Sequence, residues 1–164
     1  MRNSRTAVSY GALRHRIAVR LKEASETLKK MGYKSQPITA KEFYDYMTGE
    51  TPTGDTITIL DVLDSEFLML HEVVEIGELK KSGIPINKYT VMLLTSNVYE
   101  THYTAIECEL NCALEKKNYD WLKVRINHAK SWLEDDDMPA RLIPRCKAVI
   151  KKFSEALPNG EDKI

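Results

Sequence analysis

Apolar residues recur along most of the chain at the three- and four-residue spacing of amphipathic helices, and strand-like alternation is nearly absent. Thr39 and Glu42 have the spacing of a capping box, which predicts a short helix from there to Gly49. The clearest apolar stripe lies nearer the amino terminus and predicts a helix over residues 6–31. Its members are Tyr10, Leu13, Ile17, Leu21, Ala24, Leu28 and Met31.

The centre of the chain predicts two long helices, over about 56–81 and 88–115. Between them lies a short turn centred on Ile84 and Pro85, and Asn87 is the expected N-cap of the second helix. Because a short connection makes helices antiparallel neighbours, these two are expected to form a long hairpin.

Two further helices are expected in the last third of the chain. One spans residues 121–133 and begins at Asn118 or Asp120, both of which are common N-caps. The other begins near Pro139, which suits a first helical turn, and Pro144 is expected to break or kink it.

Taken together, the pattern predicts an all-α fold: one domain over residues 1–164, built as a bundle of five or six helices. Residues 1–5 and 158–164 are expected to fray. The composition, 43% hydrophobic and 29% charged, is that of a globular protein, and no apolar run approaches the roughly 20 residues of a membrane span. Three cysteines form no disulfide framework, so a reducing, cytoplasmic location is expected.

The net charge is zero, with 24 basic and 24 acidic residues, but the charges are unevenly placed. Residues 1–22 contain six basic side chains and no acidic one. Such a segment can bind nucleic acid, or it can pack against an acidic stripe of its own chain or of a partner. We favour the second interpretation because aromatic residues hardly interleave the basic ones.

Four charged or titratable residues fall on predicted apolar faces. On a helical projection Glu66, His102 and Glu109 point into the packed side of the hairpin, and Arg125 lies in an apolar arc of its helix. The turn geometry places Glu66 level with residue 104, within reach of His102. Since an unpaired buried charge is costly, these residues are expected to form a cluster with Arg125 as the counter-charge.

This cluster has two interpretations. The favoured one is a structural ion-pair group that specifies how the helices pack. The alternative is a site for zinc, manganese or iron, or an acid–base site, because Glu66, Glu109 and His102 offer suitable ligand types.

A second candidate metal set lies on the polar stripe of the 56–81 helix. His71 and Glu75 are four residues apart and could hold a divalent cation together with Glu100, if the polar faces of the hairpin meet. The run His71-Glu72-Val73-Val74-Glu75 is not the zinc-protease motif, which needs a second histidine at position 75. A solvated acidic stripe is the favoured interpretation. The predicted stripe is Asp61, Asp64, Ser65, His71, Glu72, Glu75 and Glu78.

Other familiar motifs are missing from the sequence. No glutamate has a histidine three residues later, as di-iron helix bundles require, and no glycine-rich phosphate loop occurs. Cys108 and Cys112 are poorly placed for a disulfide on one helix, and with Cys146 they are expected to be small buried hydrophobes.

The sequence therefore leaves function open among three classes. The favoured one is a non-catalytic interaction or oligomerisation protein, expected to be a homodimer because the apolar stripe of the first helix extends about 30 Å. The second is a metal-binding protein or metal-dependent enzyme that uses the residues named above. The third is nucleic-acid binding through the basic first helix.

Overall fold

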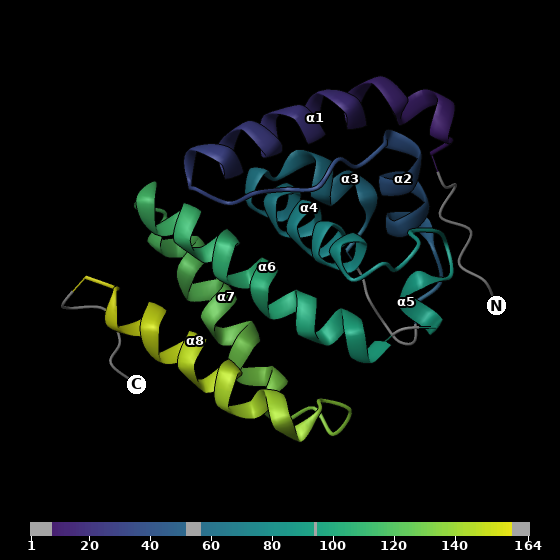
Figure 1. The fold of residues 1–164 in the computed structure, drawn as a ribbon. Coiled ribbons are helices and arrows are strands. Elements are labelled where there is room, and N and C mark those ends of the chain that lie inside the picture. The colour runs from purple at the N-terminus through teal and green to yellow at the C-terminus, as the bar shows by residue number, and fades with distance from the viewer. Residues whose placement is uncertain (1–7, 52–56, 94, 159–164) are drawn as a thin grey trace.

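The structure is a computed structural model that describes residues 8–51, 57–93 and 95–158. These residues form eight α-helices and one short 3-10 helix and contain no β-strand, which confirms the predicted all-α class (Figure 1). The ends expected to fray lie outside the described residues, apart from residue 158. The helices are α1 (Tyr10–Lys30), α2 (Ala40–Thr48), α3 (Ile59–Asp64), α4 (Glu66–Lys81), α5 (Thr90–Leu93), α6 (Thr95–Glu115), α7 (Tyr119–Trp132), the 3-10 helix η1 (Ala140–Leu142) and α8 (Ile143–Glu155).

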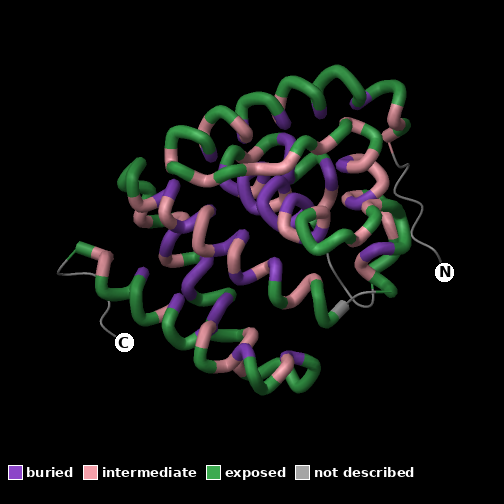
Figure 2. The backbone as a smooth tube through the Cα atoms, in the orientation of Figure 1, coloured by how far each residue is buried: buried purple, intermediate pink, exposed green. Residues whose placement is uncertain are grey.

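Helix α4 lies at the centre of the fold. Helices α1 and α3 pack against it on one side, and α6 packs along it on the other, with α7 and α8 beyond α6 (Figure 1). Ten of the sixteen residues of α4 are buried, and Figure 2 shows this burial on the turns enclosed by the other helices. Two of the buried residues, His71 and Glu75, are polar, and they belong to the site described below.

The first two helices form close to their predicted places, with α1 beginning at Tyr10 behind its Ser9 cap, four residues later than predicted. The stripe on α1 is buried from Leu13 to Leu28, and Gly32 follows the helix with φ of 81°, a conformation that glycine adopts readily. At the start of α2, Thr39 Oγ1 accepts a hydrogen bond from the backbone of Glu42, and the Glu42 carboxylate accepts one from the backbone of Thr39. The capping box is thus complete.

The prediction of one helix over 56–81 is wrong, because Ser65 divides this segment into α3 and α4. Ser65 has extended backbone angles, φ of −115° and ψ of 121°, and its side chain accepts a hydrogen bond from Leu68 N at 3.2 Å. A serine that caps a new helix offers the backbone an alternative to continuing the old one. Glu66 consequently occupies the first position of α4.

The second half of the predicted hairpin also differs. Residues 88–115 contain the short α5 and the long α6, and residue 94 between them lies outside the described residues. Helices α4 and α6 run antiparallel. Residues that face each other across them lie at roughly equal distances in sequence from residue 90, and not from Ile84 and Pro85 as predicted. The extra turn of α5 lengthens the connection, so Glu66 lies beside Lys116 and not beside residue 104.

The carboxyl-terminal helices begin at specific capping residues. Asn118, and not Asp120, caps α7 by accepting a hydrogen bond from Trp121 N at 3.1 Å. Pro144 lies in the first turn of α8, where its missing N–H has no helical partner to lose, and the η1 turn precedes that helix. Pro144 therefore starts a helix instead of kinking one.

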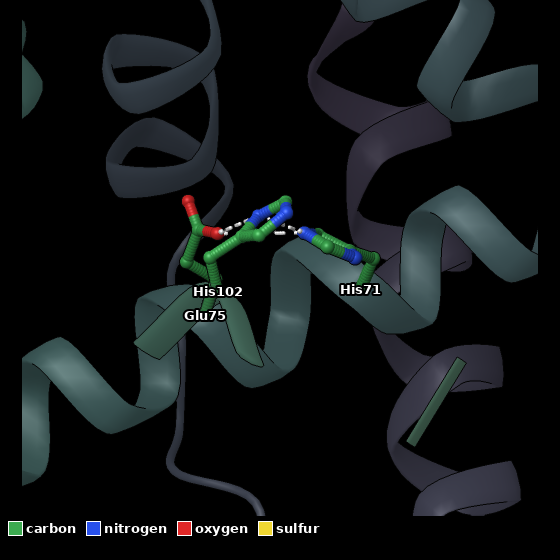
Figure 3. Close-up of side chains that lie close together, drawn as sticks. All are labelled: His71, Glu75 and His102. Atoms are coloured by element: carbon green, nitrogen blue, oxygen red, sulfur yellow. Dashed lines mark hydrogen bonds and ion pairs between the residues drawn. The ribbon is translucent and has the colours of Figure 1, made fainter. Parts of the chain in front are cut away.

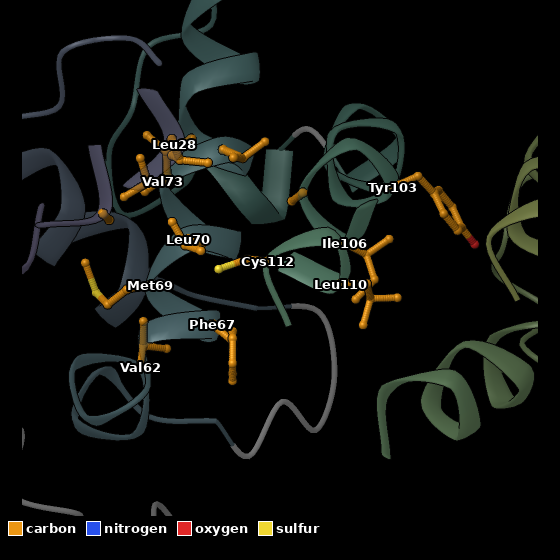
Figure 4. Packing of buried hydrophobic residues seen from close by; sticks show 14 of the residues in the cluster. Leu28, Val62, Phe67, Met69, Leu70, Val73, Tyr103, Ile106, Leu110 and Cys112 are labelled. Atoms are coloured by element: carbon orange, nitrogen blue, oxygen red, sulfur yellow. The ribbon is translucent and has the colours of Figure 1, made fainter. Parts of the chain in front are cut away.

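Side chains from α1, α3, α4 and α6 meet in an apolar core (Figure 4). Leu28, Val62 and Ile106 are fully buried within it, and Cys112 packs among them as a free thiol. Among the described residues, no helix combines the length and apolar character needed to cross a membrane. The core holds α4 and α6 side by side and so fixes the polar residues that face each other across them.

Candidate metal centre

Three side chains from α4 and α6 converge between these helices. His71 and Glu75 lie one turn apart on α4 and are almost completely buried, and His102 approaches from α6 (Figure 3). His71 Nε2 lies 3.0 Å from His102 Nδ1, and Glu75 Oε2 lies 3.4 Å from His71 Nε2 and 3.2 Å from His102 Nδ1. Three potential ligand atoms thus form a nearly equilateral triangle.

Protons alone do not satisfy this triangle. The Glu75 carboxylate only accepts hydrogen bonds, and each facing ring nitrogen carries at most one proton. A proton on His71 Nε2 leaves His102 Nδ1 and Glu75 Oε2 as two acceptors 3.2 Å apart, and a proton on His102 Nδ1 leaves a similar pair 3.4 Å apart. At most two of the three edges are therefore hydrogen bonds, whereas a cation would interact favourably with all three atoms.

The opposite nitrogen of His71 faces a buried carboxylate. His71 Nδ1 donates a hydrogen bond to Glu109 Oε2 at 2.8 Å. Glu109, on α6, is fully buried, and two side chains from α7 donate to it: Trp121 Nε1 at 2.7 Å and Arg125 NH2 at 3.0 Å. A second contact joins Arg125 Nε to Glu109 Oε1 at 2.7 Å. Helix α7 thus supports the histidine through Glu109.

Glu75 and His102 are held by neighbours of their own. Tyr46, on α2, donates a hydrogen bond from its hydroxyl to Glu75 Oε1 at 2.5 Å, which leaves Oε2 to face the histidines. The His102 ring packs edge-on against Trp132, with the ring centres 4.7 Å apart. Its side chain retains 27% exposure, so solvent reaches the cluster along this histidine.

The surroundings of the two histidines shift their pKa values in opposite directions. Burial alone would lower the pKa of His71, but hydrogen bonds to Glu109 and Glu75 outweigh it and raise the pKa to about 10. Loss of solvation lowers the pKa of His102 despite its contact with Glu75, and the nearby charge of His71 acts in the same direction. At neutral pH His71 is therefore cationic and His102 is neutral.

Both carboxylates remain ionised. Burial alone would raise the pKa values of Glu75 and Glu109, but the hydrogen bonds from the histidines, and Arg125 in the case of Glu109, lower both. Two carboxylates, His71 and Arg125 then give a net charge of zero. The cluster is thus neutral only while His71 carries its second proton, and a metal ion bound at His71 Nε2 would displace that proton.

The structure recombines the two metal sets considered from the sequence. It brings together His71 and Glu75 from one set with His102 and Glu109 from the other, and it places Arg125 against Glu109. The expectation that His71 and Glu75 lie on a solvated stripe is wrong, because α4 is enclosed by helices on both sides.

The other two candidate ligands lie elsewhere. Glu66 does not point into the apolar face as predicted; at the first position of α4 it is half-exposed and pairs with Lys116. Glu100 is also half-exposed and pairs with Arg141.

The sequence does not predict the two residues that donate hydrogen bonds to the carboxylates of the site, Trp121 to Glu109 and Tyr46 to Glu75. Trp121 precedes Arg125 by four positions and lies on the same face of α7, a spacing that lets both side chains contact one residue of a neighbouring helix. No local pattern in the sequence indicates that Tyr46 contacts Glu75, since the two residues are 29 positions apart. The site therefore depends on long-range packing that local periodicity does not encode.

Comparison with protein-family models, curated proteins and solved structures finds no match for this chain. Function is accordingly inferred from the geometry and chemistry of the cluster.

Proposed function

We propose that this protein binds one divalent transition-metal ion, zinc, iron or manganese, through His71 Nε2, His102 Nδ1 and Glu75 Oε2. The observation that carries the proposal is the triangle of these atoms, with edges of 3.0, 3.2 and 3.4 Å. A tetrahedral zinc ion about 2.0–2.1 Å from its ligands keeps them about 3.3 Å apart. The donor atoms thus have the spacing of metal ligands.

The same distances leave room for further ligands. The circle through the three atoms has a radius of about 1.9 Å, so an ion about 2.1 Å from each would lie about 1 Å out of their plane. Two histidines and one carboxylate on one face of an ion are typical of catalytic zinc and non-haem iron centres, which keep positions open for water or substrate. A metal-dependent enzyme is therefore the natural extension of this proposal.

The charges of the cluster support a divalent ion. When the ion replaces the proton between His71 and its neighbours, the two carboxylates and Arg125 leave a net charge of +1. A metal-bound hydroxide would bring this to zero, so the surroundings favour ionisation of bound water.

Oligomerisation is the second candidate, but on different grounds from those first considered. The stripe on α1 packs inside the chain, so its length no longer argues for a dimer. The observation that favours association is an exposed apolar group formed by Tyr89, just before α5, with Met92 and Leu93 on α5; their exposures are 46%, 43% and 77%. Native mass tests this candidate.

Nucleic-acid binding has less support. Within the described part of the basic segment, Arg16 pairs with Asp64 and Arg20 pairs with Glu23. These contacts favour neutralisation of the basic segment by acidic residues of the same chain.

A reducing, intracellular setting fits the three free thiols of Cys108, Cys112 and Cys146.

Metal analysis of His102→Ala tests the proposed function. Protein purified without chelators or a histidine tag is expected to retain about one metal ion per chain, and His102→Ala is expected to lose it with unchanged helix content. His15→Ala, which removes an exposed histidine on α1, is the matched control and is expected to keep the metal. Equal occupancy in both variants, or none in the unmodified protein, would contradict the proposal.

A further inference from the structure

Glu109 contacts the candidate metal centre without being one of its three ligands. Its carboxylate is fully buried on α6 and reaches His71 from the side opposite the triangle, at Nδ1. A carboxylate is acceptor-only, so the hydrogen bond places a proton on Nδ1. The remaining lone pair of a neutral His71 is then on Nε2, the nitrogen that faces His102 and Glu75.

The carboxylate is itself held by donors alone. Oε1 accepts from Trp121 Nε1 and lies 2.7 Å from Arg125 Nε, and Oε2 accepts from His71 and from Arg125 NH2. The Trp121 ring also packs against Phe67 on α4, with the ring centres 5.3 Å apart. Helix α7 thereby fixes Glu109 from one side while α4 presents His71 from the other.

We infer that Glu109 is a positioning residue of the metal site, held by Trp121 and Arg125, and that it fixes His71 in the tautomer whose Nε2 binds the ion. This inference rests on the proposed function. Partners of this kind orient a ligating imidazole and increase its basicity, and their loss typically weakens metal binding 10- to 100-fold.

Glutamine at position 109 would reverse the tautomer. If its NH₂ group replaced Oε1, it would face the Trp121 Nε1 donor and lie 2.7 Å from Arg125 Nε. If it replaced Oε2, it would face the Arg125 Nη2 donor besides His71. The second orientation costs less. It directs the NH₂ group at His71 Nδ1, which must then accept, so the proton moves to Nε2 and blocks the ligating nitrogen.

The test is a cobalt(II) titration of the full chain, which measures affinity, together with the visible spectrum of the bound ion, which reports its coordination. Histidine side-chain ¹⁵N spectra, recorded without metal and during a zinc titration, report which ring nitrogen carries the proton. Glu109→Gln is expected to bind cobalt 10- to 100-fold more weakly and with an altered spectrum. In the metal-free variant, neutral His71 is expected to carry its proton on Nε2. Glu107→Gln is the matched control, because Glu107 lies on the same helix, pairs with Arg145 and does not contact His71. It is expected to bind cobalt like the unmodified protein.

A second variant separates positioning from folding. Glu109→Gln leaves the Arg125 guanidinium buried without its full charge partner, so Glu109→Gln/Arg125→Met removes both charges and keeps the tautomer reversal. If the folded double variant binds cobalt with unmodified affinity and spectrum, the positioning role is overturned while metal binding stands. If the unmodified protein does not bind cobalt or zinc, the proposed function fails and the positioning role fails with it.

Discussion

Raising the pH from 7 to 9 is expected to tighten metal binding by this protein about 100-fold. The proposed ion would compete with a proton on His71, whose pKa is raised to about 10 by hydrogen bonds to Glu109 and Glu75 that outweigh its burial. The proton is bound below that pKa, so affinity rises about tenfold for each pH unit up to about 10 and then levels off. At pH 7 displacing the proton costs about 4 kcal/mol, three pH units at 1.36 kcal/mol each.

Calorimetry measures both the affinity and the proton. Zinc titrations between pH 7 and 9, in buffers of different ionisation enthalpy, are expected to show about one proton released per ion from the site. Ionisation of zinc-bound water adds to the release in the same range, and Glu109→Gln distinguishes the two sources. Because this variant loses the charge that raises the pKa of His71, its affinity is expected to vary less with pH. An affinity independent of pH in the unmodified protein would show that the ion does not displace a proton from His71.

Two further predictions concern stability. Arg125→Ala removes the guanidinium that pairs with the buried Glu109 carboxylate and is expected to lower the free energy of unfolding by about 3–5 kcal/mol, measured by urea denaturation. A loss below about 1 kcal/mol would show that the pair is solvated. Ser65→Ala removes the side-chain cap of α4 and is expected to cost about 1 kcal/mol in the same assay, and an unchanged midpoint would contradict a capping role.

Local signals in the sequence were sufficient for the helices that begin at a strong cap and bury one face. The capping box at Thr39 and Glu42 is an example, because its spacing alone defines the start of α2. The division at Ser65 left no such signal. Only one residue separates α3 from α4, and apolar residues continue at helical spacing across it.

The candidate metal centre was predicted only in pieces. Glu109 and Arg125 stood out because a charge on an apolar face needs a partner, and the structure pairs them. Helical periodicity places His71 and Glu75 on a solvated stripe, because it assumes that only one side of a helix is buried. Helix α4 is enclosed by α1 and α3 on one side and by α6 on the other, so His71 and Glu75 are buried as well.

Register explains the remaining misplacement. A turn centred on Ile84 and Pro85 would pair Glu66 with the region of His102, but α5 lengthens the connection. The shift brings Glu75 to His102 and moves Glu66 out to Lys116. Loop length, which local periodicity specifies poorly, thus decides which residues form the site.

The most direct test of the central claim is a crystal structure of the zinc-loaded protein with diffraction recorded on both sides of the zinc absorption edge. We expect one anomalous peak between α4 and α6, about 2.0–2.2 Å from His71 Nε2, His102 Nδ1 and Glu75 Oε2. We also expect that His71 Nδ1 still donates to Glu109. A peak bound by other residues, or no peak at this triangle in zinc-soaked crystals, would contradict the account.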